Sequence, residues 1–167
     1  MYPTFARTKP PSSFVSKSLL ATLRQYNWTQ IALFHSNINN SIYNDATSAI
    51  ISTLENDPEF KILVQKSWSE MYHYGWDENE IFETWIKEVK NQARIFVIVG
   101  DSDAHLGLLN AMHKQGLFSV DNFDEYFVIG IDLSVWNEKG ETVLLGGKFS
   151  YELCFYRGGF VPQRSFE

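Results

Sequence analysis

The chain has 167 residues, a size that suits one domain with a substantial core. Its 44% hydrophobic and 16% aromatic residues exclude an intrinsically disordered chain, and its net charge of -6 argues against nucleic acid as a partner, because phosphate binding needs a concentrated basic surface. The sequence has no run of about 18 apolar residues, so we expect no membrane contact by this chain itself. Its first residues lack the pattern of a signal peptide, so a secreted form would need a leader upstream.

The first predicted unit is a helix followed by a buried strand. Ser12 follows two prolines and is a good N-terminal cap. One apolar stripe then recurs at helical spacing: Val15, Leu19, Leu23 and Tyr26. Asn27 is suited to the left-handed residue that ends a helix. The continuous apolar run at 31–34 is typical of a strand that is covered on both faces.

Helices and strands then alternate to about residue 131. The predicted elements are a helix over 43–54, a strand from about 61, a helix over 81–89, a strand at 95–99, a helix over 102–112 and a strand at 126–131. Asp77 and Glu80 resemble a capping box before the second of these helices, and Ser102 is the predicted cap of the third. Gly116 and Leu117 have the form of a Schellman ending.

The spacing of the predicted strands, near residues 30, 61, 94 and 126, fits βαβ units. Right-handed crossovers then give an α/β fold, with a parallel sheet of about four to five strands and helices on both faces. The predicted strand order is 2-1-3-4. After Asp132 the pattern fades and glycines interrupt, so we expect a domain over 1–135 and an irregular, incomplete tail over 136–167.

Residues 7–36 read RTKPPSSFVSKSLLATLRQYNWTQIALFHS, and later phrases read IFVIVGDSD, HKQGL and YFVIGIDL. With these phrases the chain, over about residues 2–135, resembles the extracellular ligand-binding region of receptor guanylyl cyclases of the natriuretic-peptide-receptor type, in the ANF-receptor family. The resemblance implies one lobe of a type I periplasmic-binding-protein-like fold. It also implies a missing first lobe, a homodimeric single-pass parent receptor on the extracellular side of the plasma membrane, and signalling through cyclic GMP.

Candidate ligand-binding residues come from the ends of the predicted strands. In an open parallel sheet, ligands bind beyond the carboxyl ends of the strands, at the point where the strand order reverses. Short polar side chains follow these ends: Ser36, Asn37, Ser69, Asp101, Ser102, Asp103 and Asp132. For the three residues at 101–103, simple capping of the following helix is the competing interpretation.

The loop over 37–43 is a second candidate. The resemblance implies that Asn39, Ser41, Ile42 and Tyr43 face a peptide or small-molecule ligand. The competing interpretation is a surface loop in which Ser41 caps a helix. Two short sequons, N-W-T at Asn27 and N-N-S at Asn39, make these asparagines candidate glycosylation sites.

Aromatic residues are dense in a segment after the second predicted strand. Its members are Trp68, Met71, Tyr72, Tyr74 and Trp76. Such a segment is either a protein-contact patch, since tyrosine and tryptophan dominate interface energies, or a loop folded over its own core.

The sequence gives no enzyme motif, and we predict no cofactor and no metal site. Asp101 and His105 lie four residues apart on one predicted helix, but a metal site needs a further ligand. We therefore interpret the chain as a ligand-binding lobe and expect the isolated chain to bind its natural ligand weakly or not at all. The alternatives are an intracellular α/β regulatory or enzymatic domain, or a secreted binding module.

Overall fold

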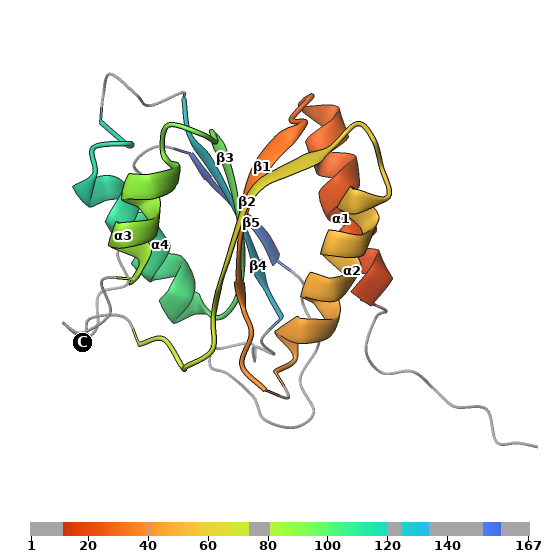
Figure 1. Ribbon diagram of the computed structural model, residues 1–167, viewed down its shortest axis with the longest axis horizontal. Helices are drawn as coiled ribbons and strands as arrows, with labels where there is room; N and C mark the ends of the chain where they lie inside the picture. The colour runs from red at the N-terminus through yellow and green to blue at the C-terminus, as the bar shows by residue number, and fades with distance from the viewer. Residues whose placement is uncertain (1–11, 40, 74–80, 120–124, 134–151, 158–167) are drawn as a thin grey trace, which may run out of the picture.

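The computed structural model in Figure 1 describes residues 12–39, 41–73, 81–119, 125–133 and 152–157. In chain order the elements are α1 (Ser12–Gln25), β1 (Gln30–Ser36), α2 (Tyr43–Glu55), β2 (Lys61–Trp68), α3 (Ile81–Val89), β3 (Ile95–Val99), α4 (Ser102–Lys114), β4 (Phe127–Asp132) and β5 (Glu152–Arg157). The predicted alternation of helices and strands up to β4 is confirmed.

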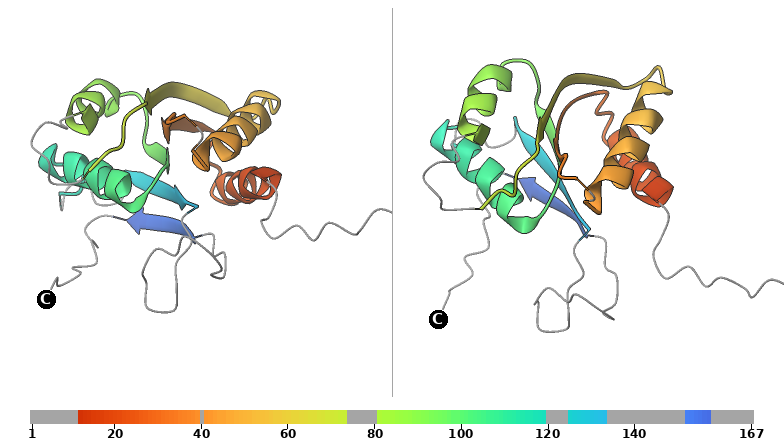
Figure 2. Two further views of the ribbon diagram at one scale, coloured as in Figure 1. Left: turned by 90° about the horizontal axis from the view of Figure 1, so that it is seen from below. Right: turned by 60° about the horizontal axis from the view of Figure 1, so that its bottom comes forward.

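The strands form one sheet in the order β2-β1-β3-β4-β5. The pairs β1–β2, β1–β3 and β3–β4 are parallel, so the predicted α/β fold and the predicted order of the first four strands are confirmed. Helices α1 and α2 cover one face of the sheet, and α3 and α4 cover the other (Figure 1, Figure 2). This arrangement is the one that right-handed crossovers produce.

Alternate residues of the central strands fill two separate cores. Phe34 and Phe96 pack beneath α3 and α4, whereas Leu33 and Val97 pack beneath α1 and α2. All five residues of β3 are buried, because this strand is covered by helices on both faces. The two-residue period of a strand therefore divides one apolar run between two helical layers.

Two helix ends have Schellman geometry, which confirms the left-handed residue predicted at Asn27 and the Schellman ending predicted at Gly116. At the end of α1, Asn27 has φ 56°, and the Trp28 N–H donates to the Leu23 carbonyl at 2.8 Å. At the end of α4, Gly116 has φ 73°, and the Leu117 N–H donates to the Met112 carbonyl at 3.1 Å. Both left-handed positions hold a residue type that tolerates positive φ.

Strand β5 is the main difference from the sequence analysis, which assigned no strand to the tail. It pairs antiparallel with β4, from Phe127 opposite Arg157 to Asp132 opposite Glu152. The segment 134–151 and the capping box expected at Asp77 and Glu80 lie outside the described residues. The division of the chain near residue 135 stays a prediction.

Candidate functional site

The four parallel strands end at one edge of the sheet, which we call the carboxyl edge. Ser36, Trp68, Val99 and Asp132 are the last residues of these strands. Just beyond the strands, the Asn37 N–H donates to the Trp68 carbonyl at 2.7 Å. The segments that follow β1 and β2 therefore lie side by side, as the predicted strand order requires.

Asp101 is the cap of α4. Its Oδ1 accepts the Ala104 N–H at 2.9 Å, in extended backbone geometry. The prediction that Ser102 caps this helix is wrong, because Ser102 is its first residue and is exposed. Burial raises the pKa of Asp101, as do the charges of Asp103 and Asp132, while the Ala104 N–H opposes the rise. The capping interpretation thus accounts for Asp101.

Asp132 and Tyr43 meet at the carboxyl edge although 89 positions separate them in the chain. The Tyr43 hydroxyl donates to Asp132 Oδ1 at 3.0 Å, and both residues are buried. This hydrogen bond ties the first residue of α2 to the last residue of β4. Its burial makes it a support for the edge and not a contact that an incoming ligand meets first.

His105, considered in the sequence only as a metal ligand together with Asp101, is buried, with 4% of its surface exposed. Burial lowers its pKa to about 4, against the opposing effects of Asp132 and the Ile131 backbone. Its Nε2 has no hydrogen-bond partner among the described residues. The available signal was its spacing with Leu109 and Met112, which places it on the apolar stripe of α4.

His73 and Asp103 link the segment after β2 to α4. The His73 Nδ1 lies 3.8 Å from Asp103 Oδ2, and both side chains are partly exposed. In the part of the chain that the structure describes, no cluster of three or more His, Cys, Asp or Glu side chains has the arrangement of a metal site.

The loop over 37–43 is closed by its own polar groups. Ser41 Oγ accepts the Tyr43 N–H at 3.2 Å, so Ser41 helps to cap α2, as the competing interpretation holds. The Asn44 side chain donates to the Ile38 carbonyl at 3.0 Å. Asn39 and Ile42 remain exposed on this loop. The loop therefore offers an amide and an apolar side chain to solvent at the carboxyl edge.

The aromatic segment after β2 folds partly over its own core, since Trp68 and Tyr72 are buried. The fit is close: a Cβ at Gly100 would lie 2.8 Å from the Trp68 ring, and a Cβ at Gly107 would lie 2.3 Å from the Tyr72 hydroxyl oxygen. Met71, in contrast, is 66% exposed. Tyr74 and Trp76 lie outside the described residues.

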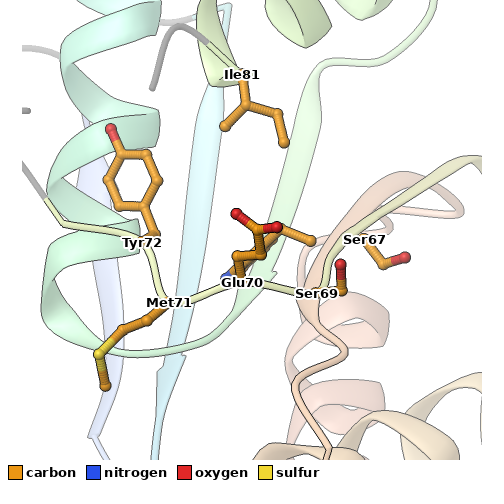
Figure 3. A pocket seen from close by; sticks show the side chains of 7 residues that line it. Ser67, Ser69, Glu70, Met71, Tyr72 and Ile81 are labelled. Atoms are coloured by element: carbon orange, nitrogen blue, oxygen red, sulfur yellow. The ribbon is translucent and has the colours of Figure 1, made fainter. Parts of the chain in front are cut away.

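A pocket of about 200 Å³ lies beside this segment. Its lining residues are Ser67, Trp68, Ser69, Glu70, Met71, Tyr72 and Ile81. Figure 3 shows oxygen atoms of Ser67, Ser69 and Glu70 along the segment, with Ile81 reaching toward them from α3. The pocket combines hydroxyl and carboxyl groups with a thioether and an aliphatic side chain, which suits an amphipathic ligand.

The predicted site residues fall into three groups. The exposed group consists of Asn37, Asn39, Ser69 and Ser102. The half-buried group consists of Ser41, Asp101 and Asp103. The buried group consists of Ser36, Tyr43 and Asp132. Only the first two groups can touch a ligand without rearrangement. Ser36 Oγ has no partner among the described residues, although the side chain is buried.

Comparison with known proteins identifies the family. The profile of the receptor family ligand binding region matches residues 1–123. The chain belongs to this ANF-receptor family. This membership confirms the resemblance found in the sequence, while the natriuretic-peptide subtype stays a prediction. Among the described residues, no helix of this ANF-receptor domain is long and apolar enough to cross a membrane.

Three curated relatives are similar to most of this ANF-receptor chain. It is 28% identical over 151 residues to the receptor-type guanylate cyclase Gyc76C of Drosophila melanogaster and 31% identical over 137 residues to the resact receptor of Arbacia punctulata. It is also 28% identical over 140 residues to the speract receptor of Strongylocentrotus purpuratus. These alignments cover 82%, 80% and 81% of this chain, but only 9%, 13% and 12% of the relatives.

Proposed function

We propose that this chain is one lobe of the extracellular ligand-binding region of a membrane receptor guanylate cyclase. Support comes from its membership in the receptor ligand-binding family and from its similarity to a receptor-type guanylate cyclase. Two further relatives are named for resact and speract, the ligands of those receptors. The parent protein then makes cyclic GMP, and this chain contributes ligand recognition and no catalytic group.

The ligand of this lobe is a peptide that binds at the carboxyl edge, between the loop over 37–43 and the pocket at 67–72. The observation that carries this location is the 66% exposed Met71 beside a polar-rimmed pocket. An exposed thioether gains free energy when a ligand covers it, and methionine adapts to irregular partners. Asn37, Asn39 and Ser69 are the exposed polar groups that accompany it.

Signalling follows from a change in the relative placement of the two lobes, each of which moves as a rigid body. The ligand contacts this lobe and a first lobe, and its binding favours one relative arrangement of the two lobes in a receptor dimer. The buried hydrogen bond between Tyr43 and Asp132 holds α2 against β4, so that the edge moves as one unit. The first lobe, the dimer and the extracellular location are parts of the proposal.

The test uses the full parent receptor in cultured cells, with intracellular cyclic GMP as the readout and a panel of peptides that includes resact and speract. With an activating peptide, we expect Met71→Ser to raise the half-maximal concentration about tenfold or more, because burial of a methionine side chain contributes roughly 1.5–3 kcal/mol. Phe14→Ser is the matched control, since Phe14 is also exposed but lies on α1, on the other face of the sheet.

An unchanged half-maximal concentration for Met71→Ser would remove the carboxyl edge from the binding site. A parent protein that reaches the cell surface, carries a functional cyclase and responds to no peptide would contradict the peptide class of ligand.

A further inference from the structure

Three aromatic rings, in contact one after another, lead from the sheet to the surface at the end of α1. Trp28 stacks on Tyr26, with ring centroids 4.7 Å apart and planes at 22°. Trp28 also contacts Phe127 of β4, with centroids 4.9 Å apart and planes tilted by 38°. Phe127 and Trp28 are partly buried against the core beneath α1 and α2, whereas Tyr26 is 57% exposed. The outermost ring therefore presents aromatic surface to solvent.

Asn27 lies between the two stacked residues and is exposed. Its φ of 56° and the hydrogen bonds of the Schellman ending fix the backbone at this point. No described residue makes a hydrogen bond to its side-chain amide. Trp28 and Thr29 complete an N-x-T sequon, so the amide has the sequence context that N-glycosylation requires.

We infer that Asn27 carries an N-linked glycan and that the exposed Tyr26 ring is the platform on which its first sugar packs. In the transfer, the Asn27 Nδ2 attacks the anomeric carbon of an oligosaccharide held on a lipid diphosphate. A C–N bond forms, the bond from that carbon to the diphosphate oxygen breaks, the amide loses one proton, and the lipid diphosphate leaves.

The platform follows from the chemistry of the two surfaces. One face of a pyranose ring is lined with weakly positive C–H groups, and the face of an aromatic ring is negative, so the two attract each other. Trp28 stacks on the Tyr26 ring and itself packs on Phe127, and this support restrains the Tyr26 ring, so less entropy is lost when a sugar covers it.

The second sequon lacks these features. The Ser41 hydroxyl of the Asn39 sequon already accepts the Tyr43 N–H, and the described residues place no aromatic stack beside Asn39. Asn39 also lies at the carboxyl edge, where a glycan would cover the proposed ligand surface. Asn27 precedes the first residue of β1 by three positions and so lies at the opposite edge of the sheet. A glycan there leaves the carboxyl edge free.

This inference rests on the proposed function in one respect, the extracellular location of the chain, because N-glycosylation requires entry into the secretory pathway. The experiment therefore adds a cleavable secretion signal to the full chain and produces it in insect cells and in bacteria. All preparations carry Asn39→Gln, which leaves Asn27 as the acceptor under test. Peptide mass spectrometry measures occupancy, and thermal unfolding of the same variant with and without the glycan gives its effect on Tm.

We expect Asn27 to be occupied, and Thr29→Ala to abolish occupancy without changing Asn27 itself. The glycan should raise Tm by about 2–4 °C in the parent sequence and in Tyr26→Phe, and by less than 1 °C in Tyr26→Ala. A bare Asn27 in the secreted, folded chain would overturn the inference. An equal rise of Tm in Tyr26→Ala would overturn the role of the platform. A glycan on the secreted chain but not on the native protein would instead contradict the extracellular location.

Discussion

At the scale of single residues, Gly107 decides how the segment after β2 lies on α4. A Cβ at this position would lie 2.3 Å from the Tyr72 hydroxyl oxygen and 2.5 Å from the ring. The Tyr72 ring must therefore shift when any larger residue stands at position 107. Glycine is unfavourable inside a helix by about 1 kcal/mol, so the close contact is the physical reason for it here.

We predict that Gly107→Ala lowers the free energy of unfolding by about 1–3 kcal/mol, because overpacking displaces a buried ring. In a Tyr72→Ala background the same change should be neutral or stabilising by up to about 1 kcal/mol, since only the helix propensity remains. Urea unfolding of the four proteins of this cycle measures both values. Equal effects in the two backgrounds would show that Tyr72 does not pack on Gly107.

The buried side chain of His105 is a second single-residue feature, and it should make the stability of the folded protein depend on pH. Burial lowers its pKa to about 4, below the ordinary value of about 6.5 in an unfolded chain. The unfolded state thus binds more protons between these values, so stability is full above about pH 6.5 and falls as the pH drops toward 4. Asp101 has a raised pKa and acts in the opposite direction.

We expect His105→Asn to remove this loss, which amounts to at most about 3 kcal/mol between pH 7 and pH 4. Asparagine retains a donor for the Ile131 backbone but does not titrate. Chemical unfolding at several pH values measures the difference between the two proteins. A variant that loses stability in acid as steeply as the parent would assign the dependence to carboxyl groups instead.

At the scale of elements, the hydrogen bond between Tyr43 and Asp132 joins a helix of one layer to a strand of the sheet. We predict that Tyr43→Phe lowers the free energy of unfolding by about 1.5–3 kcal/mol, the usual loss for a hydrogen bond to a charged group. Amide hydrogen exchange should rise in the first turn of α2. Tyr26→Phe in unglycosylated protein is the control and should change neither quantity, since that side chain is exposed.

At the scale of the whole molecule, the carboxyl edge is open, with Met71 exposed at the pocket and Ile42 exposed on the loop before α2. A ligand that touches this edge alone covers little surface, while association costs several kcal/mol of rigid-body freedom. We therefore expect the isolated chain to bind the activating peptide at least about a hundredfold more weakly than the complete extracellular region. Calorimetric titration of both proteins compares the dissociation constants, and equal values would contradict the two-lobe site.

The sequence by itself determined the elements up to β4 and their order in the sheet. Apolar residues at periods of two and 3.6 mark strands and helices locally, and the right-handed crossover then restricts the topology. Residues suited to positive φ, such as Asn27 and Gly116, likewise mark helix ends without knowledge of the fold.

Only the tertiary structure decided which polar residues of the edge are buried and which face solvent. Tyr43 and Asp132 form their contact across 89 positions, and no local pattern encodes such a pairing. Strand β5 was missed for the same reason, because an antiparallel strand on β4 depends on its partner and not on its own periodicity. Burial of His105 likewise depends on the packing of α4 on the sheet, which local spacing indicates only in outline.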